Sequence, residues 1–211
     1  SGCKELIEAY REHRDIHAIT ASQVFGVPLD KVTPQMRRSA KAVNFGIIYG
    51  ISSFGLAKDL GISAKRAGEY IDKYFQTYSD VKKYMDENVE RAKREGYITT
   101  LCGRRRVINE LKSSNYNVRS FGERAAMNMP LQGSSADIIK IAMINVRKKL
   151  SEAGLRARLV LQVHDELVLD CPEGEKDAAS EILQREMENA VSLKVPLTVE
   201  IACGKSWFSA K

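Results

Sequence analysis

The segment from Thr33 to Gly50 constrains the fold most, because it carries both a start and a stop signal for a helix. The Thr33 hydroxyl can cap a helix, and Pro34 suits the first helical position. Gly50 suits the residue just beyond a helix, since glycine takes the left-handed backbone conformation at low cost. The segment is therefore predicted to be a single helix.

Four side chains of this predicted helix recur at every fourth residue: Arg37, Lys41, Phe45 and Tyr49. Four residues are slightly more than one helical turn, so these side chains form one winding stripe. Two cations followed by two aromatic rings suit a nucleoside triphosphate, with its anionic tail and its stackable base and sugar. The same spacing also fits an ordinary amphipathic helix with solvated cations and aromatic rings in the core. Another face is small and aliphatic and is expected to be buried: Ala40, Val43 and Ile47.

The composition is that of a soluble globular protein. The 211 residues are 28% charged and 44% hydrophobic, enough for one large domain or two small subdomains. No apolar run approaches the roughly 20 residues needed to span a bilayer, and no N-terminal segment has the layout of a signal peptide. The net charge of +6 and the pI near 9.1 favour a polyanionic partner only weakly. The four cysteines are scattered without C-x-x-C spacing, so reduced thiols in a cytosol are expected.

The pattern R-x-x-x-K-x-x-x-F-x-x-x-Y-G, which ends at Gly50, resembles the nucleotide-binding helix in the fingers of family A DNA polymerases. The resemblance continues through nearly all of the chain. It implies that Arg37 and Lys41 hold the triphosphate of an incoming deoxynucleotide. It also implies that Phe45 stacks on the nucleotide and that Tyr49 borders the templating base. By the same resemblance, Phe45→Tyr in the full enzyme would raise the incorporation of dideoxynucleotides.

Asp15-Ile16-His17 opens a second predicted helix, which extends through Val24. Taken alone, His17 is simply a residue at the start of a helix. In the family, a histidine in this D-I-H setting lies near the incoming triphosphate. The resemblance therefore makes His17 a candidate phosphate contact.

A basic hairpin is predicted near residues 97–108, with strand-forming residues on both sides of a turn. The densest positive cluster of the chain lies beside that turn: Arg104, Arg105 and Arg106. From the residues alone, phosphate contact and a solvated, charged hairpin are equally open interpretations. G-R-R-R after a short strand is also the family's pattern, and the resemblance implies contact with the DNA backbone.

A helix over residues 115–129 is predicted to stop at Pro130. Arg124 and Asn128 share one face of that helix, and Gln132 follows the break. Their donors suit the minor groove, where every base pair offers acceptors, so pairing geometry can be sensed without reading sequence. R-x-x-x-N-x-P-x-Q-G is similar to the family's segment that faces the primer–template minor groove. The resemblance carries that role to these three residues.

Two apolar, β-prone runs, 159–163 and 167–169, flank His164, Asp165 and Glu166. This predicts a hairpin with two carboxylates at its tip. A charged tip often just meets solvent, but strands this apolar are expected to be buried on at least one face. Mg²⁺ takes carboxylates together with waters and substrate phosphates. Two such ions about 4 Å apart can activate a primer 3′-hydroxyl and stabilise the leaving pyrophosphate.

L-Q-V-H-D-E-L-V-L is similar to the metal-binding hairpin of family A polymerases. The resemblance implies that Asp165 is a metal ligand, that Glu166 is a supporting carboxylate at the metal, and that His164 lies near the primer terminus. It makes Asp165, Glu166 and Lys41 the candidate catalytic residues. Around this hairpin we expect an apolar helix over 135–150 packed against a sheet, a surface helix over 173–191 and a closing strand over 195–202.

The family supplies a further aspartate from a strand with wording like D-Y-S-Q-I-E, upstream of the segment that matches residues 1–15. That wording is absent from this chain, which opens with Ser1 and Gly2 rather than Met. We therefore expect a fragment that lacks one catalytic aspartate and has no polymerase activity alone.

The expected fold class is α+β. We expect a mostly helical fingers subdomain over residues 1–114 and part of a palm over 115–211, with an antiparallel sheet that carries the acidic hairpin. The expected function is template-directed addition of deoxynucleotides to a primer 3′ end by two-metal nucleotidyl transfer. Two alternatives stay open: a single-subunit RNA polymerase, and a non-catalytic nucleic-acid-binding module. The expected partners are primer–template DNA, deoxynucleoside triphosphates and two Mg²⁺ ions, for a cytoplasmic bacterial monomer without membrane association.

Overall fold

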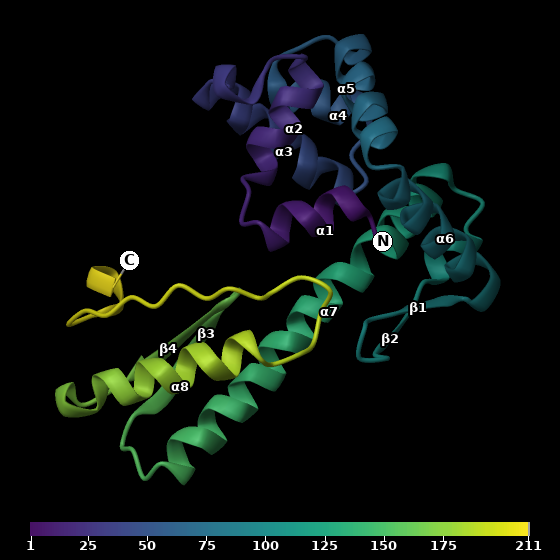
Figure 1. Ribbon diagram of the computed structural model, residues 1–211. Helices are drawn as coiled ribbons and strands as arrows, with labels where there is room; N and C mark the ends of the chain where they lie inside the picture. Colours follow the sequence, from purple (N-terminus) through teal and green to yellow (C-terminus); the bar gives the residue numbers. More distant parts are fainter. Residues whose placement is uncertain (211) are drawn as a thin grey trace. The chain divides into compact units, whose positions relative to one another are not determined.

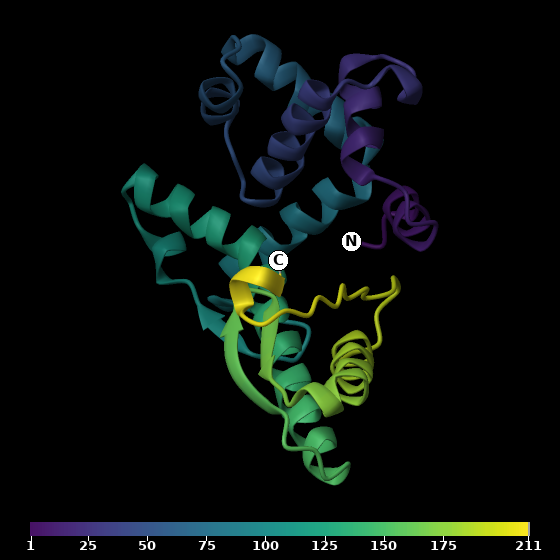
Figure 2. The same cartoon turned by 90° about the vertical axis from the view of Figure 1, so that its left-hand side faces the viewer.

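The computed structural model describes residues 1–210, which divide into two compact units (Figures 1 and 2). Unit 1 comprises residues 1–132, and unit 2 begins at Gly133, so the division falls inside one long helix. Helices dominate, and the strands within residues 1–210 form two antiparallel hairpins. The expected α+β class is confirmed. Within the same residues, no helix combines the length and the apolar character needed to cross a membrane.

Unit 1 contains six helices before its strands, and most of them begin at a side chain that caps the backbone. The side chains of Asp15, Thr33, Ser52 and Ser63 each accept a hydrogen bond from a backbone N–H of the following turn. Such caps satisfy donors that the helix leaves without partners. The helices are α1 (Lys4–Arg11), α2 (Ile16–Phe25), α3 (Pro34–Ile48), α4 (Ser53–Leu60), α5 (Ala64–Thr77) and α6 (Ser79–Glu95), with a short 3₁₀ turn at Leu29–Lys31.

Helix α3 forms as the sequence predicts. The Thr33 hydroxyl accepts from the Met36 N–H at 3.2 Å, and Pro34 is the first helical residue. Gly50 has a φ of +69°, the left-handed conformation that follows the helix. The face predicted to be buried is at most 2% exposed and joins the other helices in the core of unit 1: Ala40, Val43 and Ile47.

The basic hairpin of unit 1 consists of β1 (Tyr97–Thr99) and β2 (Arg105–Val107). The strands pair antiparallel with Tyr97 opposite Val107 and Ile98 opposite Arg106. Ile98 is fully buried in a small cluster with residues of α6 and α7, and a 3₁₀ turn at Asn109–Lys112 leads into α7. This cluster anchors the hairpin while β2 stays exposed.

Helix α7 runs without interruption from Tyr116 to Glu152, so the predicted stop at Pro130 is wrong (Figure 1). Proline has no N–H, so the Ala126 carbonyl loses its usual partner four residues on, at a cost of about 3 kcal/mol. Ala126 and Met129 are buried in the cluster beneath the basic hairpin. Tertiary packing of this kind decides whether a helix forms, and here it outweighs the missing hydrogen bond.

Unit 2 is built on the C-terminal half of α7. It adds β3 (Arg158–Val163), β4 (Glu166–Asp170), a 3₁₀ turn at Glu173–Glu175 and α8 (Lys176–Glu188). Ala142, Val146 and Leu150 of α7 form a core with Leu167 of β4 and with α8, as expected for a helix packed against a sheet. The hairpin lies beside this half of α7 in both views (Figures 1 and 2).

The hairpin is buried on one face only. Leu159 and Leu167 pack on the core of unit 2, whereas Val160 and Leu161 are 51% and 47% exposed. The pairing register shifts between Leu159 and Leu161, and such a bulge turns consecutive side chains out of strict alternation.

The predicted closing strand over residues 195–202 is wrong, because this segment has no strand structure. A strand needs a neighbouring strand to receive its backbone hydrogen bonds. The Val199 N–H instead donates to the Glu188 carboxylate at 3.1 Å, and Pro196 has no N–H to contribute. The described residues end with a 3₁₀ turn at Trp207–Ala210.

Candidate active site

The four stripe residues of α3 lie on its solvent-facing side. Phe45 and Tyr49 are 46% and 47% exposed, so these aromatic rings are not part of the core of unit 1. Arg37 and Lys41 are also exposed, and the Lys41 ammonium lies 5.9 Å from the centre of the Phe45 ring. The helix therefore presents two cations and two aromatic faces to the same side of the molecule.

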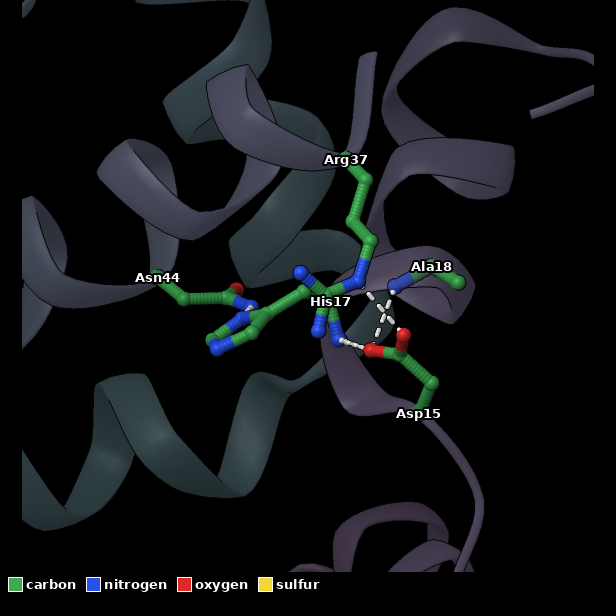
Figure 3. A network of polar contacts seen from close by, with 5 residues as sticks. All are labelled: Asp15, His17, Ala18, Arg37 and Asn44. Atoms are coloured by element: carbon green, nitrogen blue, oxygen red, sulfur yellow. Dashed lines mark hydrogen bonds and ion pairs between the residues drawn. The ribbon is translucent and has the colours of Figure 1, made fainter. Parts of the chain in front are cut away.

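Asp15 links the start of α2 to the first turn of α3 (Figure 3). Its Oδ1 accepts from the backbone N–H groups of His17 and Ala18 at 3.0 and 3.1 Å, which caps α2. Its Oδ2 accepts from the Arg37 Nε–H at 2.6 Å. This hydrogen bond holds the pKa of the Asp15 carboxyl below its ordinary value, so the pair is charged at neutral pH. Because Arg37 uses Nε for this pair, its two terminal nitrogens stay available for a planar anion.

His17 lies beside the stripe residue Phe45. Its Nδ1 is 2.9 Å from the Asn44 side-chain amide, and its ring is 5.9 Å from the Phe45 ring at a tilt of 39°. Partial burial lowers the pKa of His17, and the positive charges of Arg37 and Lys41 lower it further against an opposing effect of Asp15. The imidazole is therefore neutral at pH 7.

A pocket of about 770 Å³ lies at the aromatic end of the stripe. It brings Phe45 and Tyr49 of α3 together with Arg124 of α7. Gly50 permits this approach, because a Cβ at that position would lie only 2.9 Å from Arg124 Cγ. The other lining residues come from α3, α4, the loop between them and α7: Ala42, Gly46, Gly50, Ile51, Ser52, Asp59, Ser120, Glu123 and Met127.

The three residues predicted to face the minor groove differ in their surroundings. Arg124 is exposed, and its Nη1 donates to the Ser120 hydroxyl at 2.8 Å. Gln132 is exposed at the end of unit 1. The Asn128 Nδ2 is buried without a hydrogen-bond partner in the described part of the chain. Arg124 and Gln132 are therefore accessible to a ligand, whereas the Asn128 Nδ2 is not accessible in this conformation.

The arginine cluster on the basic hairpin is open to solvent. Arg104, Arg105 and Arg106 are all exposed, and the Arg105 guanidinium lies 4.8 Å from the centre of the Tyr97 ring. The nearby Lys93 forms ion pairs with Glu90 at 3.1 Å and Glu123 at 3.3 Å. The side chains of all three arginines are therefore accessible from solvent.

The acidic hairpin of unit 2 turns at His164 and Asp165. His164 has a φ of +53°, and its carbonyl accepts from the Gln162 side-chain amide at 2.7 Å. Glu166 is the first residue of β4, and its Oε2 accepts from the Trp207 indole N–H at 3.2 Å. His164, Asp165 and Glu166 are all exposed, as predicted for a charged tip.

Asp165 and Glu166 suit Mg²⁺ in ligand type but supply only part of a site. Both offer carboxylate oxygens, which Mg²⁺ prefers, and one Glu166 oxygen already accepts from Trp207. No group of three or more His, Cys, Asp or Glu side chains within residues 1–210 is arranged to hold a metal ion. The hairpin thus fits as one side of a metal site whose remaining ligands are waters, substrate phosphates or further side chains.

Two contacts in this site were not predicted from the sequence. The Asp15–Arg37 pair joins residues 22 positions apart, and neither spacing nor composition indicates it. The capping role of Asp15 has a signal, since an aspartate just before a helical segment is a common N-cap. Asn44 has none, because its position beside Phe45 gives no hint of a partner on α2.

Comparison with known proteins identifies the family of this chain. Residues 1–209 match the sequence model of DNA polymerase family A. The DNA polymerase I of Bacillus subtilis is 54% identical over 208 residues, and that of Caldicellulosiruptor bescii is 53% identical over 208 residues. Both alignments cover 99% of this chain and 24% of the relative, so the chain spans about a quarter of their length.

A solved structure shares the fold. The POL domain of Pol1 from M. smegmatis, in complex with DNA primer-template and dNTP, matches with a TM-score of 0.94 and 46% identity. The match covers 98% of this chain and 36% of the other chain. Because the family model matches residues 1–209, nearly the whole of this chain, the chain belongs to DNA polymerase family A.

Proposed function

We propose that this chain provides the nucleotide-binding helix and the acidic hairpin of a DNA polymerase. The reaction is template-directed addition of deoxynucleotides to a primer 3′ end. The observation that carries the proposal is the exposed stripe on α3, where two cations precede two aromatic rings and His17 lies beside them. Membership of DNA polymerase family A supports it. So does the dNTP and primer-template complex of the structurally similar POL domain.

In this proposal each side chain of the stripe contacts a different part of the nucleotide or its template. Arg37 offers the two terminal nitrogens that its pair with Asp15 leaves available, and Lys41 adds a compact charge beside the Phe45 ring. Phe45 stacks on the nucleotide, and Tyr49 borders the templating base at the pocket that Arg124 also lines. Lys41 further stabilises negative charge that develops on the triphosphate during transfer.

The DNA contacts divide into two kinds. Arg124, Asn128 and Gln132 serve the minor groove of the primer–template, where their donors meet acceptors common to all base pairs. Arg104, Arg105 and Arg106 serve the phosphate backbone, and such contacts give affinity that falls steeply with salt. His164 lies near the primer terminus.

Asp165 and Glu166 would hold the Mg²⁺ of the reaction. Bound Mg²⁺ lowers the pKa of a coordinated hydroxyl and stabilises charge on transferring phosphate. The chain's own contribution is to place both carboxylates at the hairpin tip. There the Gln162 side-chain amide donates to the His164 carbonyl, and the Trp207 indole N–H donates to the Glu166 carboxylate. With two carboxylates and no third side chain grouped with them in residues 1–210, we expect no turnover by the chain alone.

We further infer that residues 1–114 form a fingers subdomain and residues 115–211 part of a palm, in a cytoplasmic monomer. The two compact units divide after residue 132, inside α7. The proposed subdomain boundary therefore differs from this division by residues 115–132, most of which belong to the N-terminal part of α7.

Single-nucleotide primer extension tests the proposed function. We compare this chain with the longer product of its reading frame, with and without Mg²⁺, and with deoxynucleotides against ribonucleotides. Mg²⁺-dependent extension with deoxynucleotides by the longer form only is expected. Turnover by the 211 residues alone would contradict the incomplete metal site. If neither form extends a primer but both bind DNA in a salt-sensitive manner, the chain belongs to a non-catalytic binding module.

A further inference from the structure

Asn44 is a buried polar residue at the edge of the nucleotide stripe. It precedes Phe45 on α3 and is only 7% exposed. Burying an amide is unfavourable unless its polar groups are hydrogen-bonded. The Asn44 Nδ2 lies 2.9 Å from the His17 Nδ1, on helix α2, whereas its Oδ1 is buried without a partner within residues 1–210 (Figure 3). The side chain is thus held in the core with the His17 ring as its sole polar contact among the described residues.

We propose that Asn44 is a positioning residue for the triphosphate, because its amide donates to the His17 Nδ1 and fixes the imidazole as the tautomer protonated on Nε2. The inference rests on the proposed function, in which His17 contacts the triphosphate. A side-chain NH₂ group can only donate, so this contact requires Nδ1 to be an acceptor. The ring proton of the neutral imidazole is then on Nε2, which becomes the donor toward a phosphate oxygen.

The surroundings of His17 favour this neutral donor. Arg37 and Lys41 on α3 oppose a third positive charge, Asp15 on α2 favours one, and partial burial of the ring disfavours any charge. The Asp15 carboxylate is already engaged by Arg37 and by two backbone N–H groups. The ring therefore adds a directed hydrogen bond to the charges of Arg37 and Lys41, and Asn44 determines which ring nitrogen makes it.

The tautomer can be measured on the free chain. Long-range ¹H–¹⁵N correlation of the three histidines, with His17 assigned from a His17→Ala variant, distinguishes protonated from unprotonated ring nitrogens. We expect His17 to have a protonated Nε2 and an unprotonated Nδ1 at pH 7.5. Asn44→Asp replaces the donor with an acceptor, so the proton should move to Nδ1 and the new carboxylate should raise the His17 pKa. A protonated Nδ1 in the unaltered chain would overturn the proposal.

Binding of deoxythymidine triphosphate supplies the second measurement. We expect His17→Ala and Asn44→Leu each to weaken binding by about tenfold, the worth of one hydrogen bond to a charged group. The double variant should bind like His17→Ala, because Asn44 acts only through that ring. Asn88→Leu makes the same change at a buried asparagine of α6, where Arg91 is the partner, and should bind like the unaltered chain.

The two measurements separate this inference from the proposed function. Unaltered affinity in Asn44→Leu, or an additive double variant, overturns the role of Asn44 even when the nucleotide binds. If the unaltered chain binds neither deoxythymidine triphosphate nor inorganic tripolyphosphate, the nucleotide-binding function of the stripe fails, and the positioning role fails with it. The Nε2–H tautomer would still be measured in that case, so the failure would be assigned to the proposed function.

Discussion

The α3 stripe and the β3–β4 hairpin both carry charged groups to the surface, but they differ in how those groups are held. Arg37 is fixed by Asp15, and His17 is fixed by Asn44, through side chains that come from two helices. Asp165 sits at an exposed turn, and Glu166 is restrained by one hydrogen bond from Trp207. The side chains of the stripe are thus held in place by contacts within the chain, whereas the carboxylates of the hairpin, the proposed metal ligands, are held by fewer contacts.

This difference separates what each region can do alone. A preorganised set of donors loses little freedom when it binds an anion, so the stripe should bind a triphosphate without the rest of the reaction. Two carboxylates at a hairpin tip bind Mg²⁺ weakly in isolation, because the ion keeps waters and needs several fixed oxygens. Binding and turnover should therefore respond to different substitutions.

The largest expected effect is on turnover. Asp165→Asn in the longer form should lower Mg²⁺-dependent primer extension by about 10³-fold or more, since a metal ion contributes several kcal/mol to the transition state. The same change in the 211-residue chain should leave the affinity for deoxynucleoside triphosphate unaltered. Asp170→Asn, at the other end of β4, is the matched control. Equal extension rates for the Asp165→Asn and Asp170→Asn enzymes would contradict the proposed role of Asp165 in turnover, and with it the difference between the two regions.

The next effect is on binding by the stripe. Lys41→Ala should weaken triphosphate binding by the 211-residue chain about 10- to 100-fold, because a hydrogen-bonded charge is worth about 1.5–3 kcal/mol. Lys58→Ala removes an exposed lysine from α4 and should have no such effect. Isothermal titration with deoxynucleoside triphosphate measures both. Similar losses for the two lysines would mean that the chain binds the anion through net charge and not through the stripe.

A smaller effect tests the aromatic end of the stripe through stability. Gly50→Ala should lower the free energy of unfolding by about 2 kcal/mol, part from a left-handed backbone at φ +69° and part from displacing Arg124. Gly61→Ala has the same backbone conformation, with φ +65°, but no atom within 4 Å of the added methyl. It should cost only about 1 kcal/mol. Urea unfolding measures both free energies of unfolding. Equal decreases in the two variants would show that the Arg124 side chain can move aside without a cost in free energy.

Local sequence signals correctly predict the α3 helix and the β3–β4 hairpin, but they fail for two other segments. The caps and spacing of α3 are local features, so Thr33, Pro34 and Gly50 suffice to place the helix and its exposed stripe. The signals for the hairpin are also local, because two apolar runs flank a charged turn and the two strands pair across it. Helix α7 was mispredicted because packing of Ala126 and Met129 overrides the local signal of Pro130. The segment 195–202 was mispredicted because a strand requires a partner that local composition does not reveal.

The contacts that organise the stripe lie beyond sequence reasoning for the same reason. Asp15 and Arg37 are 22 residues apart, and His17 and Asn44 are 27 apart, so only the packing of α2 on α3 brings each pair together. The individual residues Arg37 and His17 were predicted, but not the side chains that hold them. Preorganisation is a property of tertiary structure, whereas local sequence patterns already indicate which side chains are candidate binding groups.

The smallest expected effect isolates the contact that holds Arg37. The Arg37 hydrogen bond lowers the pKa of Asp15 in the folded chain, so this pair stabilises the fold above the unfolded pKa near 3.8. The stabilisation disappears as the pH falls through the lower, folded value. Asp15→Asn keeps a capping side chain on α2 but removes the charge, so it should cost less than about 1 kcal/mol at pH 7 for this solvent-exposed pair.

The pH dependence gives the decisive comparison for Asp15. Urea unfolding of both chains should show a stability difference at neutral pH that vanishes in acid below the folded pKa of Asp15, since the carboxyl is then neutral and resembles the amide. A difference that persists unchanged in acid would mean that the substitution acts through the α2 cap and not through Arg37. In that case the hydrogen bond between Asn44 and His17 would be the one contact that holds a side chain of the α3 site in place. The α3 site and the hairpin would then differ only by that hydrogen bond.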